Sequence, residues 1–478
     1  MFVWLAGCVD TTTPPPASSP DATTTPVPEA PIPPTATGSS PPTTPPGPQR
    51  ALVFDGTPPT NVLMISIDTT RKDQLGIYSS EPSYTPFLDS LAESGVHLDD
   101  HQQCSNWTFG STSCTLAGRL PEDTGFIPSL NLSLGDPDNQ VPDGQRTLAS
   151  RLRSAGYYTI LATSNGWLGP SVNNAQGYAD VAQPFQVDAT NMFSEATELL
   201  AAQLAAGPTP WLLHVHLIEP HAAYNPPNEY LAEEAKLPPL PDSVDLDTQF
   251  GHYAAADQWP NLPPEGQANL EAHLWARYHG ELAYLDDQLE EIWPALDANG
   301  VLDDTLVLVW TDHGEQFWER YNQSHAYDLE AEENDGILFF WGKNLVAGAW
   351  TGPTHAVDVV PTVLDAVGVA VDPKDPPLAG EILGLAPPDR VRFATSDARM
   401  GLGQMVTVEG WKLAFNFNGI LRLYDRNTDP LELVDLYPST PDDPHVADLW
   451  NHLLPRVQLL NELRPGRALV WPAGLPTE

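Results

Sequence analysis

The chain has 478 residues, enough for a large hydrophobic core and for more than one domain. Its 63 Asp and Glu residues outnumber 21 Lys and Arg residues and give a net charge of −42. This charge excludes nucleic acid as an expected partner, because phosphates bind to a basic face. An acidic surface favours solubility and leaves cations as plausible ligands.

The N-terminal residues resemble a lipoprotein signal. Leu5-Ala6-Gly7-Cys8 is similar to the bacterial lipobox, in which a signal peptidase cuts before a cysteine that becomes lipidated. A chance match is the alternative, since the apolar part is short and no Lys or Arg precedes it. The next segment favours the lipobox, because residues 11–50 hold 14 prolines and 10 threonines and cannot bury enough apolar surface to fold.

We therefore expect a signal remnant at 1–8 and an extended, disordered linker at 9–55. No run of 18 or more apolar residues follows, so no transmembrane helix is expected. The predicted location is extracytoplasmic, in the periplasm or on the cell surface, with the lipidated Cys8 anchoring the protein to a bacterial membrane.

The rest of the chain alternates between predicted strands and helices. Short apolar runs predict buried strands at Asn61–Ile67, Trp211–Leu217 and Thr305–Thr311. The segments between these runs have apolar residues at helical spacing, for example residues 276–300 before the third strand. This alternation indicates an α/β fold with a mainly parallel central sheet flanked by helices.

The pattern changes after about residue 385. The segments VRFATSD, MVTVEGWKLAFN and ILRLYD predict short antiparallel strands, and 445–463 predicts a closing helix. We therefore expect a main domain at 56–385 and a small C-terminal α+β subdomain at 386–478.

Polar side chains follow the three predicted strands directly. Asp68 comes after the first strand, Glu219 and His221 after the second, and Asp312 and His313 after the third. Ligands of open α/β sheets bind beyond the carboxyl ends of the strands. One aspartate in such a place is more often a turn or cap residue, but three strands together favour a site for one or two divalent ions, with Ca, Mg, Mn and Zn all conceivable.

Seven segments, in order from about residue 61 to residue 460, resemble the sulfatase family of the alkaline-phosphatase superfamily. They are NVLMISIDTTRKDQLGIY, TPFLDSLAESGVHLDD, LIEPHAAYNPP, DDTLVLVWTDHGEQFWE, SHAYDLEAEENDGILFF, HAVDVVPTVLDAVGV and LYDRNTDPLELVDL. The resemblance implies the alkaline-phosphatase-like fold and a metal-dependent hydrolase of anionic sulfate or phosphate esters.

The stretch SNWTFGSTSCTLAGRLP at 105–121 matches the nucleophile region of that family. The family's nucleophile lies ten residues before the glycine of a Thr-Gly-Arg-like ending, which is AGR at 117–119, so the resemblance assigns the nucleophile to Thr108. A sulfatase proper carries Cys-x-Pro-Ser-Arg here and oxidises its cysteine to formylglycine. Neither Cys104 nor Cys114 has that position or context, and the stretch is more similar to an SWTLPS variant with a threonine nucleophile.

That variant resembles phosphodiesterases, nucleotide pyrophosphatases and phosphoethanolamine transferases. On the residue alone, an ordinary helix N-cap is the alternative for Thr108. By the resemblance, Thr108 is expected on an ion held by Asp68, Asp312 and His313, because a bound cation lowers the pKa of a hydroxyl. The helix predicted over 110–117 would offer its N-terminus to the anionic ester.

The resemblance assigns further roles around this ion. His221 and His325 are expected to serve the leaving group or a second ion, Glu219 is a further candidate ligand, and Arg71 is expected to hold the ester oxygens. A surface loop histidine is the alternative for His325.

The chain also departs from the family pattern. Thr69 stands where the family has a second aspartate. The segment ATSNGWLG at 162–169 aligns with a family segment but lacks the lysine and histidine that hold sulfate there, and Asn165 is the candidate to replace part of their role. His214 is expected to be structural. His216 has a conceivable but unassigned place at the site.

The predicted function is ester hydrolysis through a covalent Thr108 intermediate. A phosphoethanolamine-type transferase is one alternative, and a non-catalytic surface lipoprotein that keeps the fold is another. The retention of Asp68, Thr108, Asp312, His313 and His325 argues against the second.

A disulfide between Cys104 and Cys114 is expected, because export would bring them to an oxidising compartment and Cys8 would be lipidated. Two buried free thiols are the alternative.

Overall fold

The computed structural model describes residues 49–79, 83–320 and 322–477. The predicted lipobox at 1–8 and most of the predicted linker at 9–55 lie outside these residues. The end of that linker is folded, however, since Gln49 and Ala51 donate backbone hydrogen bonds of 3.0 and 2.8 Å to carbonyls in the 383–384 segment. The folded part therefore begins earlier than predicted, because this short segment finds backbone partners on the main body.

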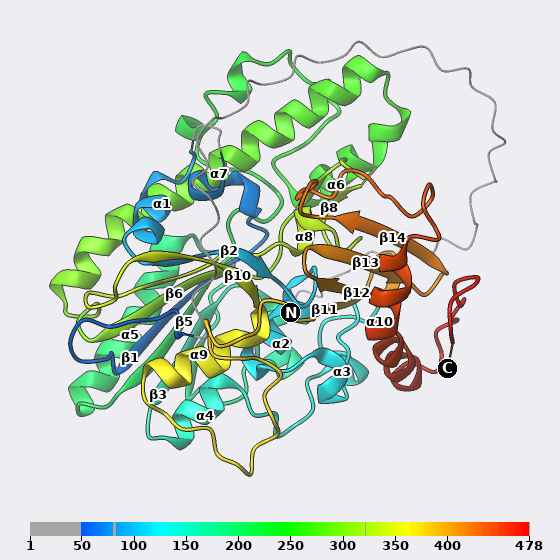
Figure 1. Cartoon of the computed structure of the whole chain (residues 1–478). Coiled ribbons are helices and arrows are strands. Elements are labelled where there is room, and N and C mark those ends of the chain that lie inside the picture. Colours follow the sequence, from blue (N-terminus) through cyan, green and yellow to red (C-terminus); the bar gives the residue numbers. More distant parts are fainter. Residues whose placement is uncertain (1–48, 80–82, 321, 478) are drawn as a thin grey trace, which may run out of the picture. The chain divides into compact units, whose positions relative to one another are not determined.

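An eight-stranded sheet lies at the centre of the described residues, which form one compact unit (Figure 1). The strand order is β10-β2-β9-β6-β1-β5-β3-β4. The three predicted strands are β1 (Asn61–Ile67), β5 (Trp211–Leu217) and β6 (Thr305–Thr311), and β1 pairs in parallel with both of the others. Every residue of β5 and β6 is buried, which explains their continuous apolar sequence.

The outer strands complete a sheet that is mainly parallel, as predicted. They are β2 (Val96–Gln102), β3 (Tyr158–Thr163), β4 (Asp180–Ala182), β9 (Leu338–Trp341) and β10 (Gly348–His355). Strand β9 runs opposite to its two neighbours, β2 on one side and β6 on the other, and it forms antiparallel pairs with both.

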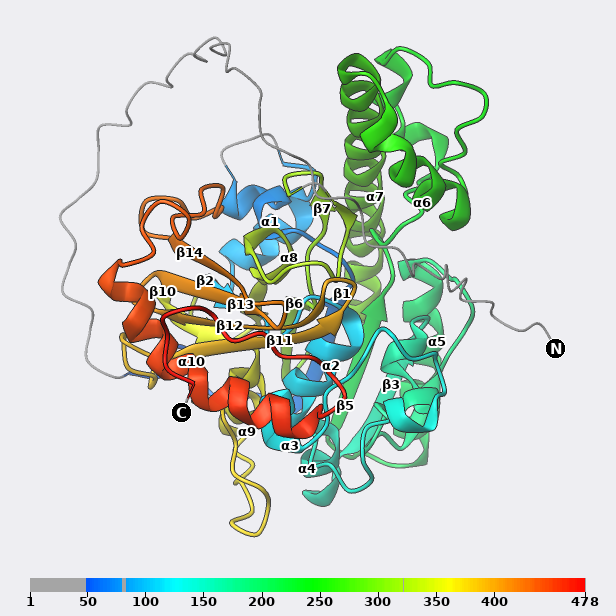
Figure 2. The ribbon, with the colours of Figure 1, turned by 90° about the vertical axis from the view of Figure 1, so that its right-hand side faces the viewer.

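Helices cover both faces of this sheet (Figure 2). On one face, α1 (Pro86–Glu93), α5 (Ala189–Ala206) and α7 (Pro264–Ala298) pack against Leu63 and Ile65 of β1. On the other, α2 (Thr108–Ala117), α4 (Leu148–Ser154) and α9 (Val359–Ala366) pack against Val62 and Met64. Alternate side chains of one strand thus supply both hydrophobic cores. The remaining elements of this part are α3 (Pro121–Thr124), α6 (Gln249–Gln258), α8 (Ala331–Asn334), β7 (Gln316–Phe317) and β8 (Gln323–Ser324).

A second, antiparallel sheet follows near the C-terminus, as predicted. It contains, in spatial order, β11 (Arg392–Ala398), β12 (Gly401–Val408), β13 (Trp411–Asn416) and β14 (Ile420–Asp425). Helix α10 (Pro444–Leu463) packs on it through the fully buried Trp450. This sheet belongs to the same compact unit as the main sheet, so the change of pattern near residue 385 marks a change of architecture and not a separate body.

Within the described ranges, none of the helices combines the length and apolar character needed to cross a bilayer.

Candidate active site

The carboxyl ends of β1, β5 and β6 bring buried polar side chains together. Asp68 follows β1, Asp312 follows β6, and His216 lies near the end of β5; all three are fully buried. One oxygen of each carboxylate and one ring nitrogen of His216 lie within 4.8 Å of one another. Neither Asp68 Oδ1 nor Asp312 Oδ2 has a hydrogen-bond partner among the described residues. These unsatisfied oxygens beside an imidazole fit a divalent cation, which would compensate their burial.

Thr108 is the first residue of α2 and faces this group. Its Oγ1 lies 3.4 Å from His313 Nε2 and 3.2 Å from Asn165 Nδ2. Asn165 Nδ2 also donates to Asp68 Oδ2 at 2.7 Å, and His313 Nε2 lies 3.4 Å from Asp68 Oδ1 and 3.6 Å from Asp312 Oδ2. Because Trp107 and not Thr108 occupies the N-cap position, the threonine hydroxyl is not used for capping. No side chain caps the start of α2, so its first N–H groups are available to an anion at this end of the helix.

The two aspartates have opposite pKa shifts. Burial raises the pKa of Asp312 well above its usual value, and the negative charge of Asp68 adds to this effect. Burial also acts to raise the pKa of Asp68, but the imidazoles of His221, His216 and His313 outweigh it and lower that pKa. Two close carboxylates cannot both ionise easily, so a cation between them would be needed to hold both as ligands.

A second group of imidazoles lies beside His313. The ring centroid of His325 is 4.4 Å from that of His313 and 5.3 Å from that of His221. His325 Nδ1 lies 3.1 Å from Glu315 Oε1, and the other oxygen of Glu315 accepts a 3.0 Å hydrogen bond from the Tyr224 hydroxyl. Burial, with the charges of His313 and His221, lowers the pKa of His325 well below its usual value. This shift favours the neutral imidazole, whose Nδ1 is held by Glu315, so that Nε2 would be the nitrogen that accepts a proton.

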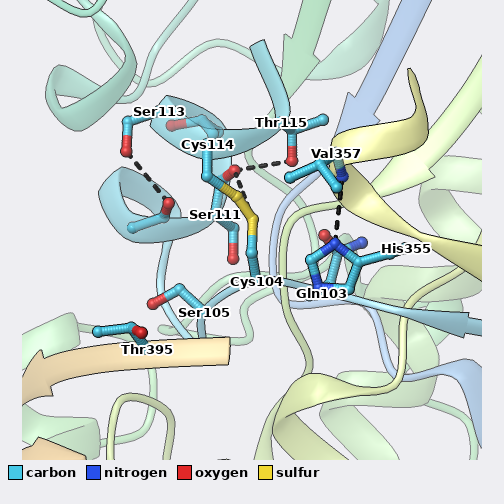
Figure 3. Close-up of a disulfide and its surroundings, with 12 residues drawn as sticks. Gln103, Cys104, Ser105, Ser111, Ser113, Cys114, Thr115, His355, Val357 and Thr395 are labelled. Atoms are coloured by element: carbon cyan, nitrogen blue, oxygen red, sulfur yellow. Dashed lines mark hydrogen bonds between the residues drawn. A yellow bond between two sulfur atoms is a disulfide. The ribbon is translucent and has the colours of Figure 1, made fainter. Parts of the chain in front are cut away.

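A disulfide joins Cys104 to Cys114, as predicted, with 6.7 Å between the Cα atoms (Figure 3). Cys104 precedes α2 and Cys114 lies within it, and both are buried against Ala356 and Val357. The disulfide therefore links the two ends of the segment 104–114, which contains Thr108.

Comparison with known proteins identifies the family. The sulfatase family model matches residues 60–369, which is more than half of the chain. This chain belongs to the sulfatase family. It is a hydrolase of sulfate- or phosphate-type esters, in agreement with the prediction.

Two relatives and one solved structure show the breadth of the similarity. A choline-sulfatase of Rhizobium meliloti (strain 1021) is 23% identical over 432 residues, which cover 79% of this chain and 82% of the relative. An arylsulfatase of Clostridium perfringens (strain 13 / Type A) is 21% identical over 455 residues, covering 79% and 90%. The structure of a phosphonate monoester hydrolase from Silicibacter pomeroyi superposes with a TM-score of 0.62 at 20% identity, covering 86% of this chain and 96% of that one.

Arg71 is directed away from the role predicted for it. Its Nε and Nη2 bind both oxygens of Asp73 at 2.9 and 2.7 Å, and Nη1 binds Glu319 and the backbone carbonyl of Glu315. Every guanidinium nitrogen is thus used within the protein. The cause is local, since a carboxylate two residues along the chain forms a bidentate pair with the arginine.

Glu219 is also directed away from the predicted ligand set. Its electrostatic neighbours are Asp188 and the backbone of Ala189 at the start of α5, and it acts in turn on Glu281 of α7. Burial raises the pKa of Glu219 to about 7. The side chain therefore faces the helices that cover the sheet, although its backbone directly follows β5.

Other residues of the candidate site were not predicted from the sequence. His216 has no assigned role in the sequence prediction. Its place near the carboxyl end of β5, together with the alternation of side chains along a strand, is the signal that indicates it. Glu315 lies three residues after Asp312 within a recognised motif, yet its bond to His325 depends on the fold.

Arg399, in the turn between β11 and β12, gave no sequence signal at all. Its backbone N–H donates to the carbonyl of Ala326, next to His325, at 2.9 Å. Its guanidinium carbon lies 5.2 Å from the ring centroid of Tyr327 and 5.6 Å from that of Tyr253. The C-terminal sheet thus brings an exposed cation to the histidine side of the site.

Proposed function

We propose that this sulfatase-family protein hydrolyses an anionic ester through a covalent intermediate on Thr108, with a divalent metal ion bound at Asp68 and Asp312. The observation that carries the proposal is the position of Thr108 Oγ1, at the start of α2 and 3.4 Å from His313 Nε2. A phosphate-type ester is favoured over a sulfate ester. Threonine cannot be oxidised to formylglycine, and water must therefore attack the intermediate at its central phosphorus or sulfur atom.

The side chains divide the metal and acid–base roles between them. Asp68 and Asp312 would hold the ion with an adjacent imidazole, and a bound divalent ion would lower the pKa of the Thr108 hydroxyl and offset charge on the ester oxygens. The Thr108 hydroxyl acts to lower the raised pKa of Asp312, so this carboxylate would take the proton that the hydroxyl loses. The amide of Asn165 and the N–H groups at the start of α2 would bind the non-bridging oxygens.

The reaction then proceeds in two displacements. Thr108 Oγ1 forms a bond to the central atom while the bond to the leaving oxygen breaks, and that oxygen departs with the bonding electron pair and takes a proton from solvent. In the second displacement, a water oxygen forms a bond to the central atom while the bond to Thr108 Oγ1 breaks. One water proton goes to an imidazole of the His221–His325 pair, and Thr108 Oγ1 regains the proton that Asp312 had taken. Glu315 keeps the His325 ring oriented throughout.

The first test compares wild type, Thr108→Ala and Thr108→Ser with an aryl phosphate, a bis-aryl phosphate and an aryl sulfate. Thr108→Ala is expected to lose activity by about 10³-fold or more while keeping its unfolding temperature, and Thr108→Ser is expected to retain part of the rate, because it keeps the hydroxyl. Full activity in folded Thr108→Ala would rule out this nucleophile. In parallel, Asp312→Ala is expected to lose its bound metal by elemental analysis.

We also propose that the protein acts outside the cytoplasm as a lipid-anchored enzyme. The buried disulfide supports an oxidising compartment, and the Leu5–Cys8 motif supports lipidation. Expression of Cys8→Ser tests the anchor: the variant is expected in the soluble fraction, whereas an unchanged membrane fraction would contradict lipidation.

A further inference from the structure

The metal site has lost one oxygen donor and stands next to an additional nitrogen donor. Thr69 follows Asp68 where the family motif has a second aspartate, so the end of β1 supplies one carboxylate. His216 Nε2 lies 3.4 Å from Asp68 Oδ2, and a ring nitrogen of His216 is within 4.8 Å of ligand oxygens of both aspartates. The imidazole of His216, from β5, is thus close to the two remaining carboxylates, where the family has a further carboxylate at the position of Thr69.

A chain of buried hydrogen bonds holds the His216 ring. His216 Nδ1 lies 2.8 Å from Ser66 Oγ, Ser66 Oγ lies 2.9 Å from His214 Nε2, and His214 Nδ1 lies 2.8 Å from the Tyr178 hydroxyl. The two histidines and the serine have no exposed surface. When His216 Nδ1 donates to Ser66, Ser66 donates to His214, and His214 donates to Tyr178, the Nε2 lone pair of His216 is left free to bind a cation. Such outer hydrogen bonds orient the imidazole ligands of metals.

From this arrangement we infer that His216 is a metal ligand and that the ion is a nitrogen-binding divalent ion of the zinc type, and not calcium or magnesium. The inference rests on the proposed metal-dependent function and specifies its ion.

The balance of donors supports this ion class. Calcium takes six to eight oxygen ligands, and magnesium also binds oxygen donors. Here the carboxylates of Asp68 and Asp312 are matched by the imidazoles of His216 and His313, whose Nε2 also faces both carboxylates. Two carboxylates with imidazole nitrogen are typical of zinc and of its cobalt substitute.

The test uses full-length protein stripped of metal by a chelator and titrated calorimetrically with Zn²⁺ alone and with Ca²⁺ alone. We expect wild type to bind Zn²⁺ at least 100-fold more tightly than Ca²⁺, and the Co²⁺-loaded protein to show the visible absorption of a site with nitrogen ligands. Equal or stronger binding of Ca²⁺ by wild type would overturn the inference, and this result needs no variant.

Variants then assign the effect to His216. His216→Asp restores a carboxylate and is expected to reduce the preference for Zn²⁺ over Ca²⁺ by at least tenfold and to change the Co²⁺ spectrum. Ser66→Ala keeps every ligand but releases the ring, so its Zn²⁺ affinity should fall by about tenfold. His101→Gln is the matched control, since His101 is a buried histidine of β2 bonded to Thr354 and should leave the spectrum unchanged. If His216→Asp fails to fold, His216→Gln replaces it, with loss of Zn²⁺ affinity as the expected result.

The outcomes separate this inference from the proposed function. A Co²⁺ spectrum that is identical in wild type and the folded His216 variant would overturn the ligand assignment, while metal-dependent turnover through Thr108 could still hold. Turnover that survives complete metal removal would overturn both.

Discussion

At the scale of single residues, Arg399 differs from most arginines of this acidic chain. Arginines such as Arg71, Arg392 and Arg426 form ion pairs with carboxylates. Arg399 instead lies over the rings of Tyr253 and Tyr327, and no ion pair with a carboxylate is found for it in the described part of the chain. A guanidinium left without such a partner beside His325 is suited to bind an anionic substrate.

We predict that Arg399→Ala raises KM for an anionic aryl ester and lowers kcat/KM by about tenfold, because a charge-assisted contact worth about 1.5 kcal/mol is lost. Arg399→Lys should recover only part, since lysine lacks the planar fork. Steady-state kinetics measure both. Arg50→Ala, which removes an exposed arginine paired with Asp365, is the control and should match wild type. Unchanged kinetics in Arg399→Ala would show that Arg399 does not contact the substrate.

Some residues of the candidate site can be predicted from local sequence motifs, and others are brought there only by the tertiary fold. Asp68, Thr108, Asp312 and His325 could be proposed from motifs, because each follows a strand or lies in a recognisable segment. Arg71 and Glu219 were also proposed from motifs, but the contacts that direct their side chains elsewhere involve groups such as Glu319 and α5 that no motif reveals. Arg399 reaches the site through the packing of a separate sheet, which sequence spacing does not encode.

At the scale of elements, the disulfide is expected to stabilise the start of α2. It closes a loop with a sequence separation of 10, so its contribution in the chain-entropy model is about 2–3 kcal/mol. We predict that thiol counting on denatured, unreduced protein exported to the periplasm finds no free Cys104 or Cys114. Reduction should lower both the unfolding temperature and the rate, because the backbone around Thr108 loses a constraint. Two free thiols in exported protein would contradict the bridge.

Helix α7 carries a buried carboxyl that makes stability depend on pH. Burial raises the pKa of Glu281 to about 8, whereas the unfolded value is about 4.5. Between these values the folded chain holds a proton that the unfolded chain has lost, so this group's contribution to stability falls as pH rises, by about 1.4 kcal/mol per pH unit. Glu281→Gln keeps an acceptor for the 2.7 Å hydrogen bond from the Asn225 N–H and removes this dependence.

We therefore predict that Glu281→Gln gains stability relative to wild type between pH 5 and pH 8, measured by urea unfolding at both values. Glu290→Gln, on an exposed position of the same helix, should show no such change. A constant difference between wild type and Glu281→Gln across this range would contradict the raised pKa.

The predictions of β1, β5 and β6 are confirmed. Both faces of these strands are buried, so their sequences are continuous apolar runs that can be recognised. Strand β10, GAWTGPTH, has no such run because it lies at the edge of the sheet and is largely exposed or half-buried. Helix α7 was predicted only over 276–300, and it begins at Pro264 because its first turns pack on the residues around Trp259 and Leu262.

At the scale of the whole molecule, a buried ion pair links the C-terminal sheet to the main body. Lys412 of β13 contacts both oxygens of Glu432 at 3.1 and 2.9 Å, and neither residue has exposed surface. Glu432 also accepts a 3.1 Å hydrogen bond from the backbone N–H of Ala331, at the start of α8 in the main body. Arg399 and Asp312 are therefore carried by two parts of the chain that this buried pair connects.

We predict that Glu432→Gln destabilises the whole protein by about 3–5 kcal/mol, because it leaves the buried ammonium of Lys412 without its counter-charge. Calorimetry should show one unfolding transition at a lower temperature. Removing the exposed Lys343, which pairs with Asp297 and Asp303, should leave the transition unchanged. A wild-type transition in Glu432→Gln would contradict the coupling between the two sheets.

The central claim is that Thr108 carries the reacting group during turnover. The most direct measurement is rapid acid quenching of wild type during turnover of a bis-aryl phosphate, followed by mass spectrometry of the peptide that contains residues 105–121. We predict an aryl phosphate ester on Thr108, found in wild type and absent from Thr108→Ala. An adduct on another residue of the chain, with Thr108 unmodified, would contradict the account.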